Sequence, residues 1–147
     1  MLKLATLVCV LGVAGLLIVG GCTPESNKTW SESTDFSGYQ VTDWSGPYSV
    51  ASSLDEEFTS LNIYQTGSSL QGFDNFRRSW FGSISASTSP GINLETNDGP
   101  RGTEVIVGNF VLFETLAGTF KGAQGTHWAS PRTGVIEMMG PAVAAAP

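Results

Sequence analysis

Few side chains in this sequence are equipped for chemistry at neutral pH. The chain of 147 residues contains one histidine, His127, and two cysteines, Cys9 and Cys22. Histidine is the side chain whose ordinary pKa lies nearest neutrality, which makes His127 a candidate general base. Only a cysteine thiol supplies a sulfur nucleophile, which makes the cysteines candidates for modification.

His127 has no partner that the sequence identifies. The chain lacks the Gly-x-Ser-x-Gly segment that carries the nucleophile in many hydrolases, and a Ser-His-Asp triad is defined by geometry rather than by sequence. We therefore expect His127 to be structural or simply exposed. A small envelope hydrolase that uses His127 is kept as an alternative, and it predicts His127 beside a carboxylate and a nucleophile in a cleft.

Two further polar groups are candidates for binding ions. Asp55, Glu56 and Glu57 carry the carboxylate oxygens that calcium takes, and could bind it together with Asp43, Asp74 or Asp98. No Asp-x-Asp-x-Asp-Gly loop is present, so we interpret them as a solvated turn. Arg77 and Arg78 could clamp an anion, but neighbours on a strand point to opposite faces, so we interpret them as charges at the end of a hairpin. No glycine-rich segment matches a nucleotide-binding loop. The sequence predicts no metal site and no cofactor.

Cys22 follows a segment with the organisation of a signal peptide. Met1–Lys3 is a short basic start, Leu4–Val19 is a nearly unbroken apolar run, and Gly20 and Gly21 precede the cysteine. A transmembrane helix needs about 20 apolar residues, so the run is a little short for one. The two glycines are poor helix formers and leave a protease unobstructed. The segment therefore predicts cleavage before Cys22.

Val19, Gly20, Gly21 and Cys22 together resemble the lipobox of bacterial lipoproteins. The resemblance implies that residues 1–21 are a lipoprotein signal peptide and that a diacylglycerol is attached to the sulfur of Cys22. It also implies that lipoprotein signal peptidase cuts before Cys22, and that the new amino group is often acylated, with palmitate as a typical chain. Each buried methylene contributes about 0.8 kcal/mol, so two or three chains anchor the protein durably. An ordinary cleaved leader and an uncleaved membrane anchor remain as alternatives.

The resemblance also implies a location. Thr23 follows the cysteine, and under the enterobacterial sorting rule a lipoprotein without Asp at that position goes to the outer membrane. We therefore expect a protein of the bacterial cell envelope, lipid-anchored to the outer membrane on its periplasmic or surface face. The formal net charge of -6 and the scattered basic residues argue against nucleic acid as a partner.

Composition divides the rest of the chain into three parts. Residues 22–38 are mainly polar and predict a lipidated N-terminus followed by a flexible tether. Residues 140–147 have little to pack and predict a loose tail. In residues 39–139, apolar side chains recur at a spacing of two, and turn residues recur every 8 to 12 positions or so. This part predicts one all-β domain, an antiparallel meander of about eight strands that forms a barrel or a sandwich.

The strands and turns follow from the same pattern. Turns are expected at Thr66–Ser69, which is the strongest hairpin signal, and at Ser89–Gly91, Asn97–Pro100 and Gly122–Gly125. Leu54–Phe58 could form one helical turn. The candidate strands are Gln40–Trp44, Tyr48–Ser52, Thr59–Gln65, Ser69–Asn75, Ser79–Ala86, Gly91–Glu95, Glu104–Glu114, Leu116–Lys121 and Thr126–Ser130.

Glycines within the strands favour a barrel. Leu70–Phe73, Trp80–Ile84 and Leu116–Phe120 each place a glycine close to large apolar residues, and glycine allows a strand to coil where a sheet bends. With Gly125–Trp128, this texture resembles the strands of small bacterial meander barrels of the lipocalin-like or avidin-like kind. The likeness extends over Trp44–Arg132 and implies a barrel able to hold a small ligand.

The aromatic residues leave two uses open, because large side chains fill a core by default but can also line an apolar cavity. The sequence thus predicts a non-catalytic binding or interaction module whose partner is an envelope protein, or alternatively a lipocalin-like carrier of a small apolar ligand. A transmembrane barrel is a further rival, which the lipobox, the short strands and the polar faces oppose. The candidate cavity aromatics are Trp44, Tyr64, Trp80, Phe110, Phe120 and Trp128.

Replacement of Cys22 by Ser should abolish lipid attachment. For wild-type protein extracted from membranes, we expect an intact mass equal to a chain beginning at Cys22 plus acyl groups, because the thiol is the acceptor of the diacylglycerol. Mass spectrometry of the Cys22→Ser variant should show no such species. An unmodified wild-type chain would contradict the lipobox interpretation.

Overall fold

The computed structural model of the chain describes residues 31–33, 41–85 and 90–144. The predicted signal peptide, its cleavage motif Val19–Gly21 and the acylation site Cys22 lie outside these residues. Within them, no helix is long and apolar enough to cross a membrane. The strands in chain order are β1 (Ser31–Ser33), β2 (Gly46–Ser52), β3 (Ser60–Thr66), β4 (Ser69–Asp74), β5 (Ser79–Ser85), β6 (Gly91–Gly99), β7 (Gly102–Thr115), β8 (Gly118–Ala129) and β9 (Arg132–Ala142).

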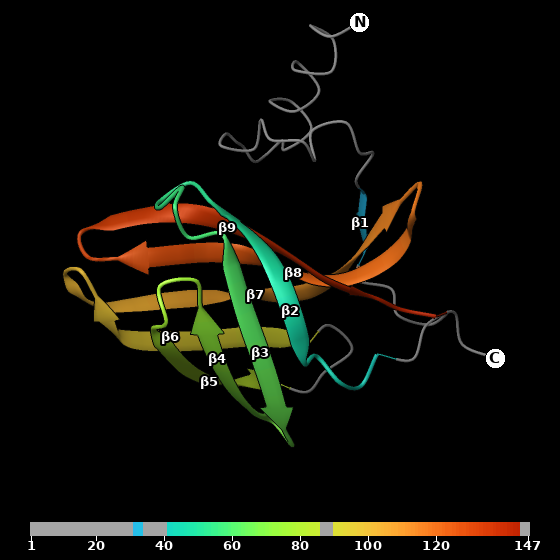
Figure 1. Ribbon diagram of the computed structural model, residues 1–147, viewed down its shortest axis with the longest axis horizontal. Helices are drawn as coiled ribbons and strands as arrows, with labels where there is room; N and C mark the ends of the chain where they lie inside the picture. The colour runs from blue at the N-terminus through green and yellow to red at the C-terminus, as the bar shows by residue number, and fades with distance from the viewer. Residues whose placement is uncertain (1–30, 34–40, 86–89, 145–147) are drawn as a thin grey trace, which may run out of the picture.

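Strands β2 to β9 form a closed, eight-stranded antiparallel barrel (Figure 1). Each strand pairs with the next along the chain, and β9 returns to β2, where Ser49 lies opposite Met139 and Ser52 opposite Ile136. Closure removes the unpaired edges that an open sheet exposes. β1 lies outside this ring and pairs with the end of β7. The structure confirms the predicted all-β meander and shows that it is a barrel rather than a sandwich.

The alternation of side chains along each strand fills the barrel. On β3, Leu61 and Ile63 are buried, whereas Asn62 and Tyr64 are exposed. Burial of one large apolar side chain contributes about 1.5–3 kcal/mol, so the filled interior is the main source of stability. Its members are Trp44, Tyr48, Phe58, Leu61, Ile63, Leu70, Trp80, Ile92, Leu94, Ile106, Phe110, Ala123, Ile136 and Met138.

The two ends of the barrel differ. In an antiparallel meander, alternate connections lie at the same end, so the β2–β3, β4–β5, β6–β7 and β8–β9 connections meet at one end, which we call the mouth. At the opposite end, the Trp44 ring stacks on Phe110 with centroids 3.8 Å apart. The Lys121 ammonium there donates a hydrogen bond to the carbonyl oxygen of Asp43 at 2.6 Å. Residues 41–45 therefore pack against the end of the barrel that is opposite the mouth.

The predicted turn at Gly122–Gly125 is wrong, because β8 runs through it without interruption. A Cβ atom at Gly122 would lie 2.3 Å from the Phe113 ring, and one at Gly125 would lie 2.1 Å from the carbonyl oxygen of Val107. These glycines allow close approach between neighbouring strands rather than a reversal of the chain.

The ends of the domain also differ from the prediction. β9 was not predicted, although Ile136 and Met138 fill the core from it, and it extends to Ala142. Residues 140–142 of the expected loose tail therefore belong to the barrel. Ser31–Ser33, expected within the tether, form β1 through backbone pairing with β7.

Two local predictions before β3 also need correction. Of the expected strand Gln40–Trp44, the described residues from Val41 onward are irregular, because Trp44 turns onto Phe110 instead of joining the sheet. Leu54–Phe58 forms a hydrogen-bonded turn rather than a helical one, since the Phe58 N–H donates to the Asp55 carbonyl oxygen at 3.2 Å.

Gly82→Ala should destabilise the barrel. A Cβ atom at Gly82 would lie 1.7 Å from the carbonyl oxygen of Asn93 on β6, so the two strands would have to separate. Overpacking of this kind costs about 1–3 kcal/mol, and urea unfolding should show a lower midpoint. Ser83→Ala, at the exposed next position of β5, is the matched control and should change the free energy of unfolding by less than about 0.5 kcal/mol. A Gly82→Ala variant as stable as wild type would contradict the close approach of β5 and β6.

Candidate functional site

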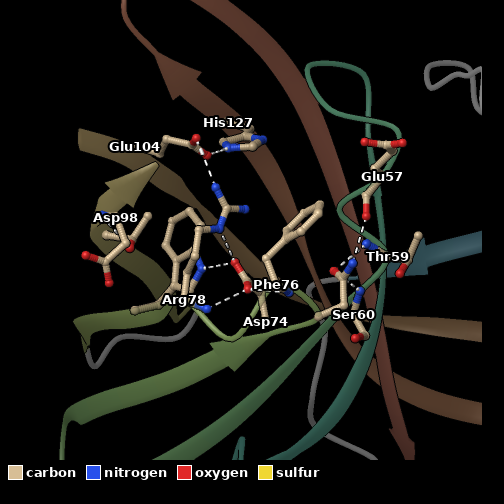
Figure 2. Close-up of polar contacts among 12 residues, drawn as sticks. Glu57, Thr59, Ser60, Asp74, Phe76, Arg78, Asp98, Glu104 and His127 are labelled. Atoms are coloured by element: carbon tan, nitrogen blue, oxygen red, sulfur yellow. Dashed lines mark hydrogen bonds and ion pairs between the residues drawn. The ribbon is translucent and has the colours of Figure 1, made fainter. Parts of the chain in front are cut away.

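A network of polar side chains lies inside the barrel close to the mouth (Figure 2). Its members are Ser52 on β2, Asp74 on β4, Arg78 just before β5, Glu104 on β7 and His127 on β8. Each is at most 8% exposed. A buried polar group without a partner costs about 1–3 kcal/mol, so these groups must satisfy one another.

The carboxylate of Asp74 organises the β4–β5 turn. Its Oδ1 accepts the backbone N–H of Phe76 at 2.8 Å and of Arg78 at 2.9 Å, while the Arg77 N–H donates to the Asp74 carbonyl oxygen. Its Oδ2 accepts Nε of Arg78 at 2.6 Å and the indole N–H of Trp80 at 2.9 Å. One carboxylate thus shapes the turn and holds the Arg78 guanidinium inside the barrel.

Glu104 connects Arg78 to His127. Its Oε2 accepts Nη1 of Arg78 at 3.1 Å, and its Oε1 lies 2.8 Å from Nε2 of His127. On the other side of the ring, Nδ1 lies 2.8 Å from Oγ of Ser52, which also accepts the Leu54 N–H. Because a carboxylate only accepts, the imidazole proton belongs on Nε2, and the Ser52 hydroxyl donates to Nδ1. Both ring nitrogens of His127 are therefore used.

The environment keeps His127 neutral. The side chain is 0% exposed, and its removal from water lowers the pKa of the imidazole below the ordinary value of 6.5. The hydrogen bond and the charge of Glu104 raise the pKa but do not outweigh burial. At neutral pH, His127 is an uncharged donor and acceptor in the network.

The mouth contains a cavity of about 580 Å³, within the range of about 300–1,000 Å³ that is usual for small-molecule sites. Arg78, Glu104 and His127 form its floor, and its wall consists of residues in or next to the four connections at the mouth. The apolar wall residues are Leu54, Phe76, Pro100 and Ala129. The charged wall residues are Asp55, Glu57, Asp98, Arg101 and Arg132.

One donor of the floor is unused. Among the residues that the structure describes, Nη2 of Arg78 is the single buried side-chain nitrogen or oxygen without a hydrogen-bond partner. The guanidinium carbon lies 4.9 Å from the ring centroid of Phe76 and 5.7 Å from those of Phe58 and Trp80. Aromatic faces attract a cation but offer no lone pair to an N–H group. Because protein atoms cover Nη2, an acceptor that enters the cavity must displace some of them to reach it.

The structure separates the aromatic residues that were predicted to line a cavity. Trp44, Trp80 and Phe110 belong to the filled core, and Phe120 is half-buried. Tyr64 is 53% exposed and Trp128 39%, because alternation along β3 and β8 places them on the outer face. Tyr64 and Trp128 therefore cannot line an interior cavity, and the residues that line the mouth cavity do not include any of the six.

The predicted polar groups also divide between surface and site. Arg77 and Arg78 lie at the end of the β4–β5 hairpin, as predicted, and point to different sides. Arg77 is exposed, whereas Asp74 and Glu104 hold Arg78 inside the barrel. Asp55 and Glu57 line the cavity, whereas Glu56 does not. In the described parts of the chain, no group of three or more His, Cys, Asp or Glu side chains is arranged to hold a metal ion.

The surroundings of His127 bear on the hydrolase alternative. Glu104 and Ser52 supply a carboxylate and a hydroxyl next to the ring, so His127 is not isolated. The hydroxyl, however, is placed away from a substrate: Ser52 is 6% exposed, is not a lining residue of the cavity and accepts the Leu54 N–H. The arrangement is better suited to holding a ligand against Arg78 and Glu104 than to nucleophilic attack by Ser52.

Ser52 and Glu104 are site residues that the sequence did not predict, and Asp74 was considered only as a possible calcium ligand. The alternation along the strands could have identified the two carboxylates. Glu104 lies two positions from Ile106 on β7, and Asp74 lies four positions from Leu70 on β4, so each points to the same inner face as that apolar residue. A charged residue at a core-facing position is rare and indicates a buried partner.

No protein-family model, curated protein or solved structure matches this chain. Its function is therefore inferred from the geometry of the cavity.

The barrel should become less stable as the pH falls below the ordinary histidine pKa of 6.5. Because folding lowers the pKa of His127, the unfolded chain binds a proton that the folded chain excludes between the two values, so stability rises with pH in that window. The slope is at most about 1.4 kcal/mol per pH unit.

Urea unfolding between about pH 5 and pH 8 measures this slope. His127→Gln is the matched variant, because its amide can donate to Glu104 and accept from Ser52 without titrating, and it should remove this part of the pH dependence. An NMR titration that placed the pKa of the His127 imidazole above 6.5 in the folded protein would contradict the prediction.

Proposed function

We propose that this protein is a non-catalytic binding module of the bacterial cell envelope, anchored to the outer membrane through acylated Cys22, which takes up a small ligand at the barrel mouth. The observation that carries the proposal is the cavity of about 580 Å³, whose lining includes Arg78, a side chain with one buried and unpartnered nitrogen, Nη2. The lipobox-like segment supports the anchor and the location.

Preorganisation supports binding. Asp74 and Glu104 fix the Arg78 guanidinium before any ligand arrives, so binding does not have to order that side chain. Glu104 lies on β7, His127 on β8 and Arg78 immediately before β5, so the closed barrel limits their relative movement. A ligand therefore meets a rigid polar floor under a wall built from turns.

The alternative of an apolar ligand inside the barrel has less support. Trp80, Phe58 and Ile63 are each 0% exposed in a filled interior, so such a ligand would have to displace the core. At the mouth, an apolar ligand would cover charged floor groups without supplying an acceptor to Arg78. The predicted carrier of an apolar ligand is thus the weaker proposal.

An envelope protein partner has one supporting observation of its own. Tyr64, Phe73 and Phe81 are 53%, 41% and 56% exposed on the neighbouring strands β3, β4 and β5, and the rings of Tyr64 and Phe73 lie 6.3 Å apart. Exposed aromatic residues are frequent in protein interfaces. A partner bound on this outer face would leave the mouth free for a small ligand.

Filling the cavity should abolish ligand binding. The wild-type protein and Ala129→Trp are screened by thermal shift against saccharides, short carboxylates and fatty alcohols, because a ligand that binds only the folded state raises Tm with its concentration. At least one class should stabilise wild type but not Ala129→Trp, whose indole enters the cavity. Thr126→Trp places the same ring on the outer face of β8 and should behave as wild type.

Two results would contradict this proposal. If none of the three classes stabilised the wild-type protein, the mouth would not be a small-molecule site. If fatty alcohols alone stabilised wild type and Ala129→Trp equally, the ligand would lie elsewhere, as the apolar carrier alternative requires.

A further inference from the structure

Two residues that line the cavity, Arg78 and Glu104, carry a hydrogen-bond donor and an acceptor side by side. Nη2 of Arg78 has no partner, while Nη1 of the same guanidinium donates to Oε2 of Glu104. Each oxygen of Glu104 accepts one hydrogen bond, from Arg78 or from His127, and a carboxylate oxygen can accept a second. A hydroxyl group matches this pair, because its oxygen can accept from Arg78 while its proton is donated to Glu104.

The charge of the floor opposes an anionic ligand. Asp74 and Glu104 are two carboxylates that share the single guanidinium of Arg78, and the neutral His127 adds no positive charge. A further carboxylate would enter a partly dry site that already has an excess negative charge, where repulsion is stronger than in water. The acceptor that Nη2 requires is therefore best supplied by an uncharged oxygen.

The wall repeats this balance of donors and acceptors. Asp98 and Glu57 can accept hydrogen bonds from a ligand, while Arg101 and Arg132 can donate them. Phe76 is 44% exposed and lines the same cavity. Figure 2 shows its ring beside Arg78. The negative face of an aromatic ring attracts weakly positive C–H groups such as those on one face of a sugar ring.

We propose that the cavity binds an uncharged, hydroxyl-rich ligand, a short saccharide, with one hydroxyl group shared between Arg78 and Glu104 and a sugar face packed on Phe76. The inference rests on the proposed function and adds the chemical class of the ligand. It assigns Arg78 and Glu104 as the pair that selects against negative charge and Phe76 as the apolar contact.

Titrations of ¹⁵N-labelled protein followed by NMR test the class of ligand. Maltose and N,N′-diacetylchitobiose are the first probes, and glucose, glucosamine and glucuronate form a set that differs in charge. We expect neutral saccharides to shift the side-chain N–H signals of Arg78 and Trp80 in wild type and Thr126→Trp, but not in Ala129→Trp. Glucuronate should bind at least about tenfold more weakly than glucose, which corresponds to about 1.4 kcal/mol.

Two variants test the assigned residues. Glu104→Gln removes the excess negative charge while keeping an acceptor for Arg78, so it should reduce the preference for glucose over glucuronate. Phe76→Leu, at a largely exposed position, should weaken saccharide binding without altering the fold. Backbone NMR spectra report whether each variant is folded, and the comparison of the three sugars in wild type decides the charge preference by itself.

Failure of this inference differs from failure of the proposed function. Glucuronate binding as tightly as glucose would overturn the selection against negative charge, and glucosamine binding more tightly than glucose would replace the uncharged ligand with a cationic one. If carboxylates or alcohols bound at the mouth and no saccharide did, the assignment of a saccharide would be wrong, but the mouth would still be a small-molecule site. The absence of binding by all three classes would overturn both proposals.

Discussion

The buried ion pair between Asp74 and Arg78 is the interaction on which the mouth of this barrel depends. Four hydrogen bonds converge on the Asp74 carboxylate, two from backbone N–H groups of the β4–β5 turn and two from the side chains of Arg78 and Trp80. Loss of one partner of such a pair leaves an uncompensated charge and typically costs about 3–5 kcal/mol. The free energy of unfolding of a typical domain is about 5–15 kcal/mol, so this loss would remove a large part of it. The polar centre is thus a requirement of the fold as well as of the site.

The barrel divides into two halves along its axis because of what each half must bury. Away from the mouth, Trp44, Phe110 and their neighbours make an apolar core that needs only close packing. Near the mouth, the chain from Asp74 through Arg78, Glu104 and His127 crosses the interior and must satisfy each polar group in turn. The buried Nη2 of Arg78 is the one member of this network without a partner, and Arg78 also lines the cavity.

Much of the fold could be predicted from the sequence, because alternation and turn chemistry are local signals. Gly67 has a φ of 61° in the predicted β3–β4 turn, as a tight hairpin requires. Glycine was ambiguous elsewhere, since Gly122 and Gly125 serve close packing between strands rather than a turn. β9 was missed because Gly134 and Gly140 interrupt its pattern.

The site was less predictable, because it depends on which strands face each other across the barrel. The alternation along β7 could identify Glu104 as a buried carboxylate, but it could not identify the residues that Glu104 contacts. Ser52 and His127 are 75 positions apart, and Arg78 and Glu104 are 26 apart. Such pairs are fixed by closure and strand pairing, which local periodicity does not encode.

The short strand β1 has a consequence for how the molecule would stand on a membrane. Ser31 pairs with Glu114, so the chain reaches the barrel at the end opposite the mouth. From Cys22 to Ser31, even a fully extended backbone spans only about 30 Å. If Cys22 is acylated as proposed, the lipid is therefore attached to the barrel at the end opposite the opening.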